Sequence, residues 1–130
     1  MYNQDFLLRT IDDFFSTIRK LVKLDIDEER EDFEKQVNDL FNSHFDLEIC
    51  NVNELLDNKN FNQYFNHYDK QILVLLFLKI SKLYFKIDND LSFKYLALAK
   101  KTLENKNSFY FYENEYLSKT IKNYLNYLES

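Results

Sequence analysis

Histidine and cysteine, which often serve as nucleophiles, general bases and metal ligands, are scarce in this sequence. His44, Cys50 and His67 are the whole set. A zinc site needs four ligands at closer, patterned spacing, and nothing marks which carboxylate would complete one. Cys50 lies beside Ile49 and Val52, so we expect a small buried apolar residue there rather than a nucleophile. We therefore predict no metal, no cofactor and no enzymatic activity.

Glycine is absent, and this excludes several phosphate-binding and cation-binding loops. The 130 residues contain no glycine and no proline. A P-loop, a dinucleotide-binding turn and an EF-hand loop all need glycine where φ is positive or where the backbone approaches phosphate closely. Hairpins of the Asn-Gly type are excluded too, which removes support from β architectures.

Asparagine is the residue that we expect at the left-handed positions of helix ends, because it tolerates that conformation better than most residues. Five asparagines stand where an apolar period breaks: Asn58, Asn60, Asn89, Asn105 and Asn107.

Six lysines at helical spacing form a second set of candidate residues. They are Lys79, Lys82 and Lys86 on one expected helix and Lys94, Lys100 and Lys101 on the next. The first three recur every three or four residues, so they share one helical face, here called the lysine row. The chain has a net charge of −5 and the row lacks arginine. We therefore do not expect nucleic acid as the partner, and keep weak nucleic-acid binding as an alternative.

Charge is distributed unevenly along the chain. Residues 25–48 contain ten acidic and two basic residues, a net of −8, whereas residues 70–106 contain eight lysines and three acids, a net of +5. We interpret this as an acidic, solvated helix beside a basic hairpin, attracted to each other only weakly.

Four aromatic residues in succession, Phe109 to Tyr112, form the third candidate site. If this segment is extended, alternate side chains point to opposite faces. Phe109 and Phe111 would then enter the core, and Tyr110 and Tyr112 would lie outside, available to a partner. The alternative is a fully packed linker in a chain that is 18% aromatic. The candidate partner-binding residues are thus Tyr110, Tyr112, Lys79, Lys82 and Lys86.

The apolar pattern predicts an all-α fold organised around a central buried helix at about 69–87. Ile72 to Leu78 is an unbroken apolar run, and an apolar row at helical spacing continues from it. The members of that row are Leu76, Ile80, Leu83 and Ile87. A helix that is apolar nearly all round is covered by neighbours on several sides. This one is too short and too lysine-rich to span a bilayer.

The other helices are expected to pack around the central one as antiparallel hairpins in a single domain, 1–130. An N-terminal hairpin, 1–45, joins helices at about 4–24 and 27–45 through a short connection at Asp25-Ile26. One or two short helices follow within 46–66. A central hairpin, 68–104, has its second helix at about 91–104, and a C-terminal helix spans 112–128.

Both alanines of the protein, Ala97 and Ala99, fall on the second helix of the central hairpin. Small side chains let helix axes approach closely, so we expect the alanines to mark the narrowest contact with the central helix, and at least one to exclude larger side chains. The hairpin from Leu76 to Leu103 is loosely like one tetratricopeptide hairpin, with Ser81 in place of the usual small residue.

The opening residues, Met1 to Ile11, read Met-Tyr-Asn-Gln-Asp-Phe-Leu-Leu-Arg-Thr-Ile. They resemble small uncharacterised bacterial proteins that begin Met-Tyr-x-x-Asp, then an aromatic, two aliphatics, Arg, x and Ile. Phe111 to Glu115 is similar to the start of the last helix in those proteins. The resemblance implies an all-helical fold with tetratricopeptide-like hairpins in the second half. It implies no activity, because none is assigned to those proteins.

We therefore expect a non-enzymatic helical interaction module that binds a protein or peptide partner, with a homodimer as one form of that role. The rival function is a small-molecule binder or enzyme with a pocket between the hairpins, and His44, His67 and Cys50 are its first candidates. A single cysteine allows no internal disulfide, and no signal peptide or membrane span is recognised. We thus expect a cytoplasmic protein without membrane attachment.

Overall fold

The computed structural model describes residues 2–66, 70–104 and 115–129. All regular structure in these residues is helical, which confirms the all-α fold. The elements are α1 (Tyr2–Leu21), α2 (Arg30–Phe45), the 3-10 turn η1 (Ile49–Asn51), α3 (Val52–Asp57), α4 (Lys59–Phe65), α5 (Lys70–Tyr84), α6 (Asn89–Glu104) and α7 (Glu115–Glu129). One or two short helices were expected within 46–66, and the structure has two, α3 and α4, after η1.

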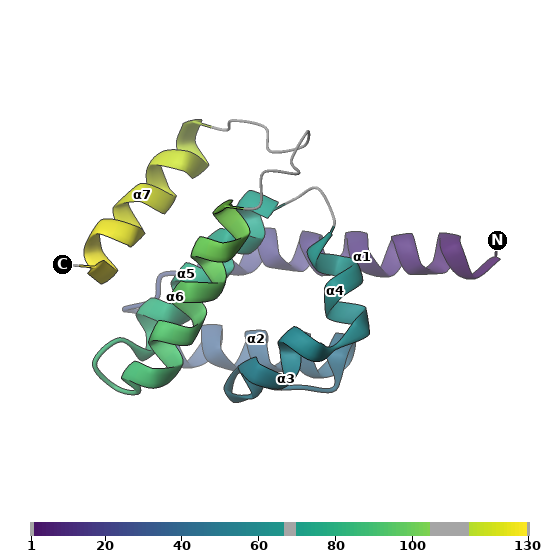
Figure 1. The fold of residues 1–130 in the computed structure, drawn as a ribbon, viewed down its shortest axis with the longest axis horizontal. Helices are drawn as coiled ribbons and strands as arrows, with labels where there is room; N and C mark the ends of the chain where they lie inside the picture. The colour runs from purple at the N-terminus through teal and green to yellow at the C-terminus, as the bar shows by residue number, and fades with distance from the viewer. Residues whose placement is uncertain (1, 67–69, 105–114, 130) are drawn as a thin grey trace.

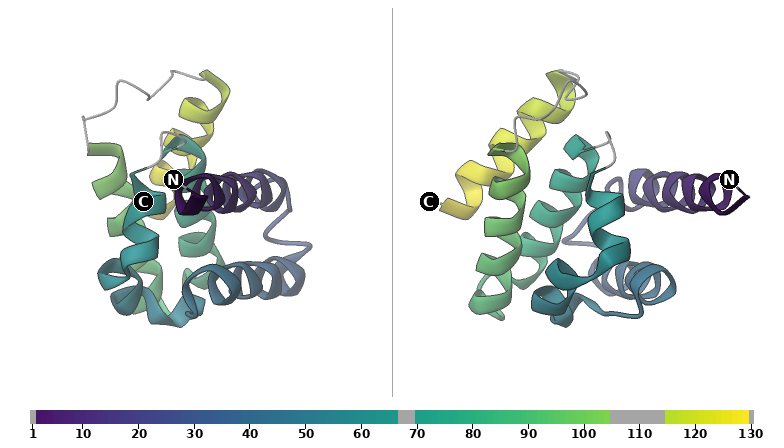
Figure 2. Two further views of the ribbon diagram at one scale, coloured as in Figure 1. Left: turned by 90° about the vertical axis from the view of Figure 1, so that its right-hand side faces the viewer. Right: turned by 45° about the vertical axis from the view of Figure 1, so that its right-hand side comes forward.

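The helices form two antiparallel pairs with α7 added to the second one (Figure 1). The pairs are α1 with α2 and α5 with α6. α5 packs most extensively against α6, and it also contacts α7 and α1. The short helices connect the two pairs, since α4 contacts α2 and α3 contacts α6. Two further views show α6 and α7 beside α5 while α1 extends away from them (Figure 2).

α5 is the central buried helix that the apolar run predicts. Twelve of its fifteen residues are buried, because α1, α6 and α7 cover it from different sides. It ends at Tyr84, earlier than expected, because Lys86 adopts a left-handed conformation with φ 69° and stops the helix. Ile87 therefore lies in the turn after α5, 67% exposed, and does not extend the apolar row.

The connection between α1 and α2 is longer than expected, because α1 ends at Leu21 and α2 begins at Arg30. Residues 27–29, which were expected at the start of the second helix, lie in a turn instead. Asp25 Oδ1 accepts hydrogen bonds from the backbone N–H groups of Asp27 (2.8 Å) and Glu28 (3.3 Å). Short polar side chains that bind nearby backbone groups in this way compete with helix formation.

The left-handed residues among those described are Asp46 (φ 57°) and Lys86, so the expectation of left-handed asparagines is wrong there. Asparagine acts through its side chain instead. Asn58 Oδ1 accepts a hydrogen bond from Phe61 N at 3.0 Å and caps α4, and Asn89 Oδ1 accepts one from Lys86 N at 2.9 Å. Asn105 and Asn107 lie outside the described residues.

Polar contacts join the first helical pair to the second. Arg30 donates a hydrogen bond to the Leu83 carbonyl, and the Tyr84 hydroxyl donates one to Glu34 Oε2 at 2.6 Å. Both contacts tie the start of α2 to the end of α5. Burial, and then the hydrogen bond to Glu34, raise the pKa of Tyr84.

The α5–α6 contact is made close by small side chains. Ser81 Oγ donates to the Ser92 carbonyl at 2.8 Å, and Ser92 Oγ donates to the Ser81 carbonyl at 2.7 Å. This reciprocal pair is fully buried, with exposures of 0% and 1%. Ala99 is also fully buried, whereas Ala97 is exposed. One alanine, not both, thus lies in the core.

We predict that Ala99→Leu destabilises the protein and that Ala97→Leu does not. The added isopropyl group at Ala99 has no space in a packed core, and overpacking of this kind costs about 1–3 kcal/mol. At Ala97 the same group extends into solvent. Urea unfolding of the two variants measures the difference in unfolding free energy. Equal stabilities would show that Ala99 marks no close packing.

Candidate functional site

A cleft of about 660 Å³ lies between the C-terminal end of α1, the α1–α2 connection, α5 and α7. Six of its lining residues are charged: Arg19, Lys23, Lys79, Lys82, Asp25 and Asp27. Four cations and two anions give this cleft lining a net charge of +2, in a chain whose net charge is −5. The cleft is therefore locally cationic.

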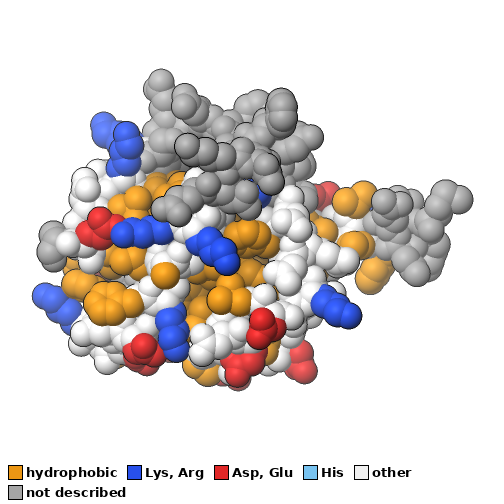
Figure 3. All heavy atoms as spheres, in the orientation of Figure 1, with side chains coloured by type: hydrophobic (Ala, Val, Ile, Leu, Met, Phe, Trp, Pro, Cys, Tyr) orange, Lys and Arg blue, Asp and Glu red, His pale blue; other side chains and the backbone are white. Residues whose placement is uncertain are grey.

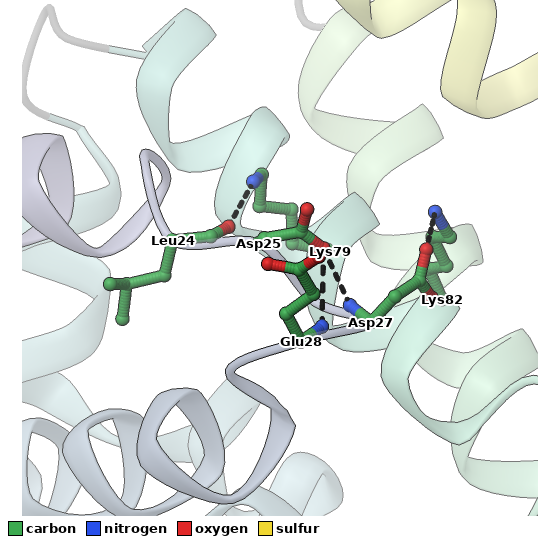
Figure 4. A network of polar contacts seen from close by, with 6 residues as sticks. All are labelled: Leu24, Asp25, Asp27, Glu28, Lys79 and Lys82. Atoms are coloured by element: carbon green, nitrogen blue, oxygen red, sulfur yellow. Dashed lines mark hydrogen bonds and ion pairs between the residues drawn. The ribbon is translucent and has the colours of Figure 1, made fainter.

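Lys79 lies at the base of this cleft, on α5, and is only 8% exposed. Its ammonium Nζ donates a hydrogen bond to the Leu24 carbonyl at 2.9 Å (Figure 4). The contact ties the α1–α2 connection to the central helix. Burial lowers the pKa of Lys79, and Lys82 lowers it further, while Asp25 and Glu29 act in the opposite direction.

Lys82 lies one turn further along α5 and faces the same connection. Its Nζ is 3.8 Å from Asp27 Oδ2 (Figure 4). The same ammonium lies 5.7 Å and 5.3 Å from the ring centres of Tyr124 and Tyr127 on α7. A cation at this distance from aromatic rings is attracted by their negative faces. Lys82 therefore joins the α1–α2 connection to α7.

The lysine row is not the continuous exposed face that its spacing predicts. Lys79 is buried, Lys82 is engaged with Asp27 and two tyrosines, and Lys86 lies beyond the end of α5. Only Lys86 is well exposed, with its Nζ 5.6 Å from the centre of the Phe85 ring. The prediction that all three lysines share one helical face is wrong for Lys86, and the contacts of Lys79 and Lys82 with other elements cover the part of the face that does form.

A small apolar groove of about 200 Å³ lies between α3 and α6. Its apolar lining residues are Val52, Leu56, Ala97 and Leu98, and its lysines are Lys94 and Lys101. Leu56 is 43% exposed, which is high for a leucine beside a packed core. Figure 3 shows this face of the molecule, where hydrophobic side chains gather with both basic and acidic side chains around them.

His44 and Tyr64 form a hydrogen-bonded pair in an aromatic cluster. His44 Nδ1 lies 3.0 Å from the Tyr64 hydroxyl, and the Phe14 ring centre is 5.1 Å from His44 and 5.0 Å from Tyr64. Burial lowers the pKa of His44, with Asp13 opposing it, and burial raises the pKa of Tyr64. A neutral imidazole and a neutral phenol are thus favoured here, as in a structural hydrogen bond.

Of the three residues named for the rival function, His44 and Cys50 lie in the described part of the chain. Cys50 is exposed, so the expectation that it is buried is wrong. His44 and Cys50 line neither the cleft nor the groove. No cluster of three or more histidine, cysteine or acidic side chains among the described residues could hold a metal ion. His67, Tyr110 and Tyr112 lie outside the described residues.

Sequence reasoning named Lys79 and Lys82 but missed the other residues of the cleft. The cleft residues come from α1, the α1–α2 connection, α5 and α7, which are distant in sequence. No local pattern brings Arg19 and Lys82 together. The uneven charge of residues 25–48 and 70–106 was the one signal that pointed to contact between these regions.

No protein-family model matches the chain, and neither the curated proteins nor the solved structures that were compared include a significant match. The resemblance of the opening residues to small bacterial proteins therefore stays a prediction, as does the tetratricopeptide-like arrangement. Within residues 2–66, 70–104 and 115–129, each helix is too short or too polar to cross a membrane.

We predict that His44 makes the protein less stable as the pH falls from about 7 towards 5. The pKa of His44 is lowered in the folded state, so the unfolded chain binds a proton first, near the ordinary histidine pKa of about 6.5. The stability is thus complete above that pH and is lost as the pH falls through the lowered value. His44→Gln keeps a polar partner for Tyr64 but cannot titrate in this range.

The measurement is the urea unfolding free energy of both proteins at several pH values from 7 to 5. We expect a shallower pH dependence for His44→Gln than for the unmodified chain. His67 is present in both proteins and so cancels in the comparison. Identical slopes would contradict the assignment of a neutral His44.

Proposed function

We propose that this chain is a non-enzymatic helical interaction module that binds a segment of a partner protein in the α3–α6 groove. The occupant that we propose is an amphipathic helix with a large apolar anchor and acidic neighbours. The observation that carries the proposal is a solvent-open groove whose lining is mostly apolar and includes two lysines, Lys94 and Lys101.

The size of the groove supports a side-chain anchor rather than a small molecule. Its volume of about 200 Å³ is below the roughly 300–1,000 Å³ of typical small-molecule pockets. Peptide helices bind such grooves by inserting one or a few apolar side chains. Leu56 and Leu98 supply the apolar floor, and Ala97 is small enough to leave the space open.

The apolar surface continues beyond the groove along α6. Phe93 is 55% exposed and lies four residues before Ala97, so the two side chains share one helical face. A partner helix that enters the groove would also cover this ring. Exposed aromatic residues beside an apolar groove are typical of positions that carry much of the binding energy of an interface.

The charge of α6 favours an acidic partner. Lys94 pairs with Asp90 on its own helix at 3.1 Å, and Lys100 pairs with Glu129 on α7. Lys101 is exposed and has no ion-pair partner in the part of the chain that the structure describes. An acidic side chain on the partner would therefore be drawn to this edge, and complementary charge of this kind mainly sets specificity and association rate.

The alternative of nucleic-acid binding through the lysine row receives no support from the positions of its residues. Lys79 and Lys82 are held within the fold, so they do not form a track of exposed cations that could follow a phosphate backbone.

We predict that Ala97→Glu weakens binding of an acidic amphipathic peptide. The probe is a fluorescein-labelled helical peptide of leucine and glutamate, and its leucine–lysine counterpart is the comparison. The new carboxylate fills the groove and repels the acidic peptide, so we expect at least a tenfold weaker Kd by fluorescence anisotropy. Asn42→Glu, an exposed position on α2, adds the same charge elsewhere and is the matched control.

Three outcomes overturn the proposal, two from the binding measurements and one from sedimentation. Equal binding of the acidic and basic peptides would show that the groove does not select an acidic partner, and unchanged binding by Ala97→Glu would place the peptide elsewhere. Sedimentation of the same samples tests a second copy of the chain as the competing occupant. A homodimer that becomes a monomer in Ala97→Glu would assign the groove to self-association instead.

A further inference from the structure

We propose that the cleft between α1, the α1–α2 connection, α5 and α7 binds a small anionic molecule through the ammonium group of Lys79. The ligand would carry a phosphate or carboxylate group on an apolar body. This site shares no lining residue with the α3–α6 groove, so the inference does not depend on the proposed partner-binding function. The volume of about 660 Å³ is within the range of small-molecule pockets.

The hydrogen bonding of Lys79 is incomplete. An ammonium group has three N–H donors, and the Leu24 carbonyl accepts one of them at 2.9 Å. Within the part of the chain that the structure describes, no other hydrogen bond or ion pair reaches its Nζ. Lys79 is only 8% exposed and lines the cleft. A buried charge with unused donors favours an anionic or strongly polar occupant at that position.

The nearby carboxylates do not neutralise Lys79 by direct contact. Asp25 Oδ1 accepts hydrogen bonds from two backbone N–H groups of its own turn, and Asp27 faces Lys82 (Figure 4). Asp25 thus binds the backbone of the α1–α2 connection, and Asp27 pairs with Lys82. Lys79 retains its attraction for an added anion, which is stronger here than in water because the site is partly desolvated.

The remaining lining residues indicate what the rest of the ligand is like. Arg19 and Lys23 add two cations from α1 and from the residues just after it, which favours a ligand with one or two negative charges. The apolar and aromatic part of the lining includes Ile72 and Leu75 on α5, Tyr124 on α7, and three residues of the α1–α2 connection, Val22, Leu24 and Ile26. An anion with an aromatic or aliphatic body would contact both the cationic and the apolar residues of the cleft. A bare inorganic ion would contact only the cationic ones.

The test is a titration of the full chain, followed by two-dimensional NMR, with four probes. Phenyl phosphate and benzoate represent the two anionic groups, inorganic phosphate lacks the apolar body, and benzyl alcohol lacks the charge. We expect one or both aromatic anions to bind at least tenfold more tightly than inorganic phosphate and benzyl alcohol. The better of the two identifies the anionic group that the cleft prefers.

Variants locate the site. Lys79→Met, which keeps the length of the side chain, should weaken binding of the better probe at least tenfold. Lys35→Met removes the same charge from an exposed position on α2 and should leave the Kd unchanged. Ala97→Glu, in the separate groove, should also leave it unchanged, so failure of this inference is distinguishable from failure of the proposed partner binding.

The unmodified protein gives a second test in case Lys79→Met does not fold. The better probe should shift the NMR signals next to the Lys79 ammonium more than those of Lys35. The inference is overturned if neither aromatic anion binds, if Lys79→Met binds as tightly as the unmodified chain, or if the Lys79 signals do not move. Binding of benzyl alcohol as tight as that of the anions would also overturn it, because the cleft would then be an apolar cavity without anion selectivity.

Discussion

Burial of α5 on nearly every side is the constraint on which the rest of the structure depends. Its unbroken apolar run, Ile72 to Leu78, has no face that suits water, and each apolar Å² removed from water contributes about 25 cal/mol. α1, α6 and α7 each cover part of it. A helix covered in this way has no exposed face on which to place its polar residues, so each of them needs a partner inside the fold.

Two buried polar residues in the second half of α5 meet that requirement differently. Ser81 finds a reciprocal partner in Ser92, which draws α6 close and leaves no group unpaired. Lys79 finds one acceptor, the Leu24 carbonyl in the α1–α2 connection, and the rest of its ammonium group faces the cleft. The first arrangement supports stability alone. The second combines a structural contact with unused N–H donors, on which the proposed anion site rests.

Both candidate sites lie beside helices that pack in the same core. The cleft lies where the α1–α2 connection and α7 approach α5 without filling the space between them. The groove lies where the short helix α3 meets α6 at Ala97, whose side chain is too small to close it. The groove proposed for partner binding and the cleft proposed for anion binding are therefore lined by different residues, and a variant at one site can leave the other intact.

Features that depend on local periodicity could be predicted from the sequence alone. Most of α5 is buried, as its apolar run predicts. On α1, Ile11, Phe14 and Ile18 recur at helical spacing and are buried too. Helix ends were less predictable, because they depend on turn contacts such as that of Asp25 with its neighbouring N–H groups.

The sites were the least predictable part. A lysine at helical spacing is usually solvated, and the burial of Lys79 depends on a carbonyl 55 residues earlier in the chain. The exposure of Cys50 and the pairing of His44 with Tyr64 likewise depend on contacts between separate elements. Such contacts leave no pattern in one sequence.

Native-state hydrogen exchange tests the central position of α5 most directly. A helix covered on nearly every side exposes its amides only when the whole domain unfolds, whereas peripheral helices open locally. We predict that the amides of Leu73 to Leu83 exchange most slowly, with an opening free energy equal to the global unfolding free energy from urea. Amides in α5 that exchange as fast as those of α7 would contradict this and show that the protein is organised around a different element.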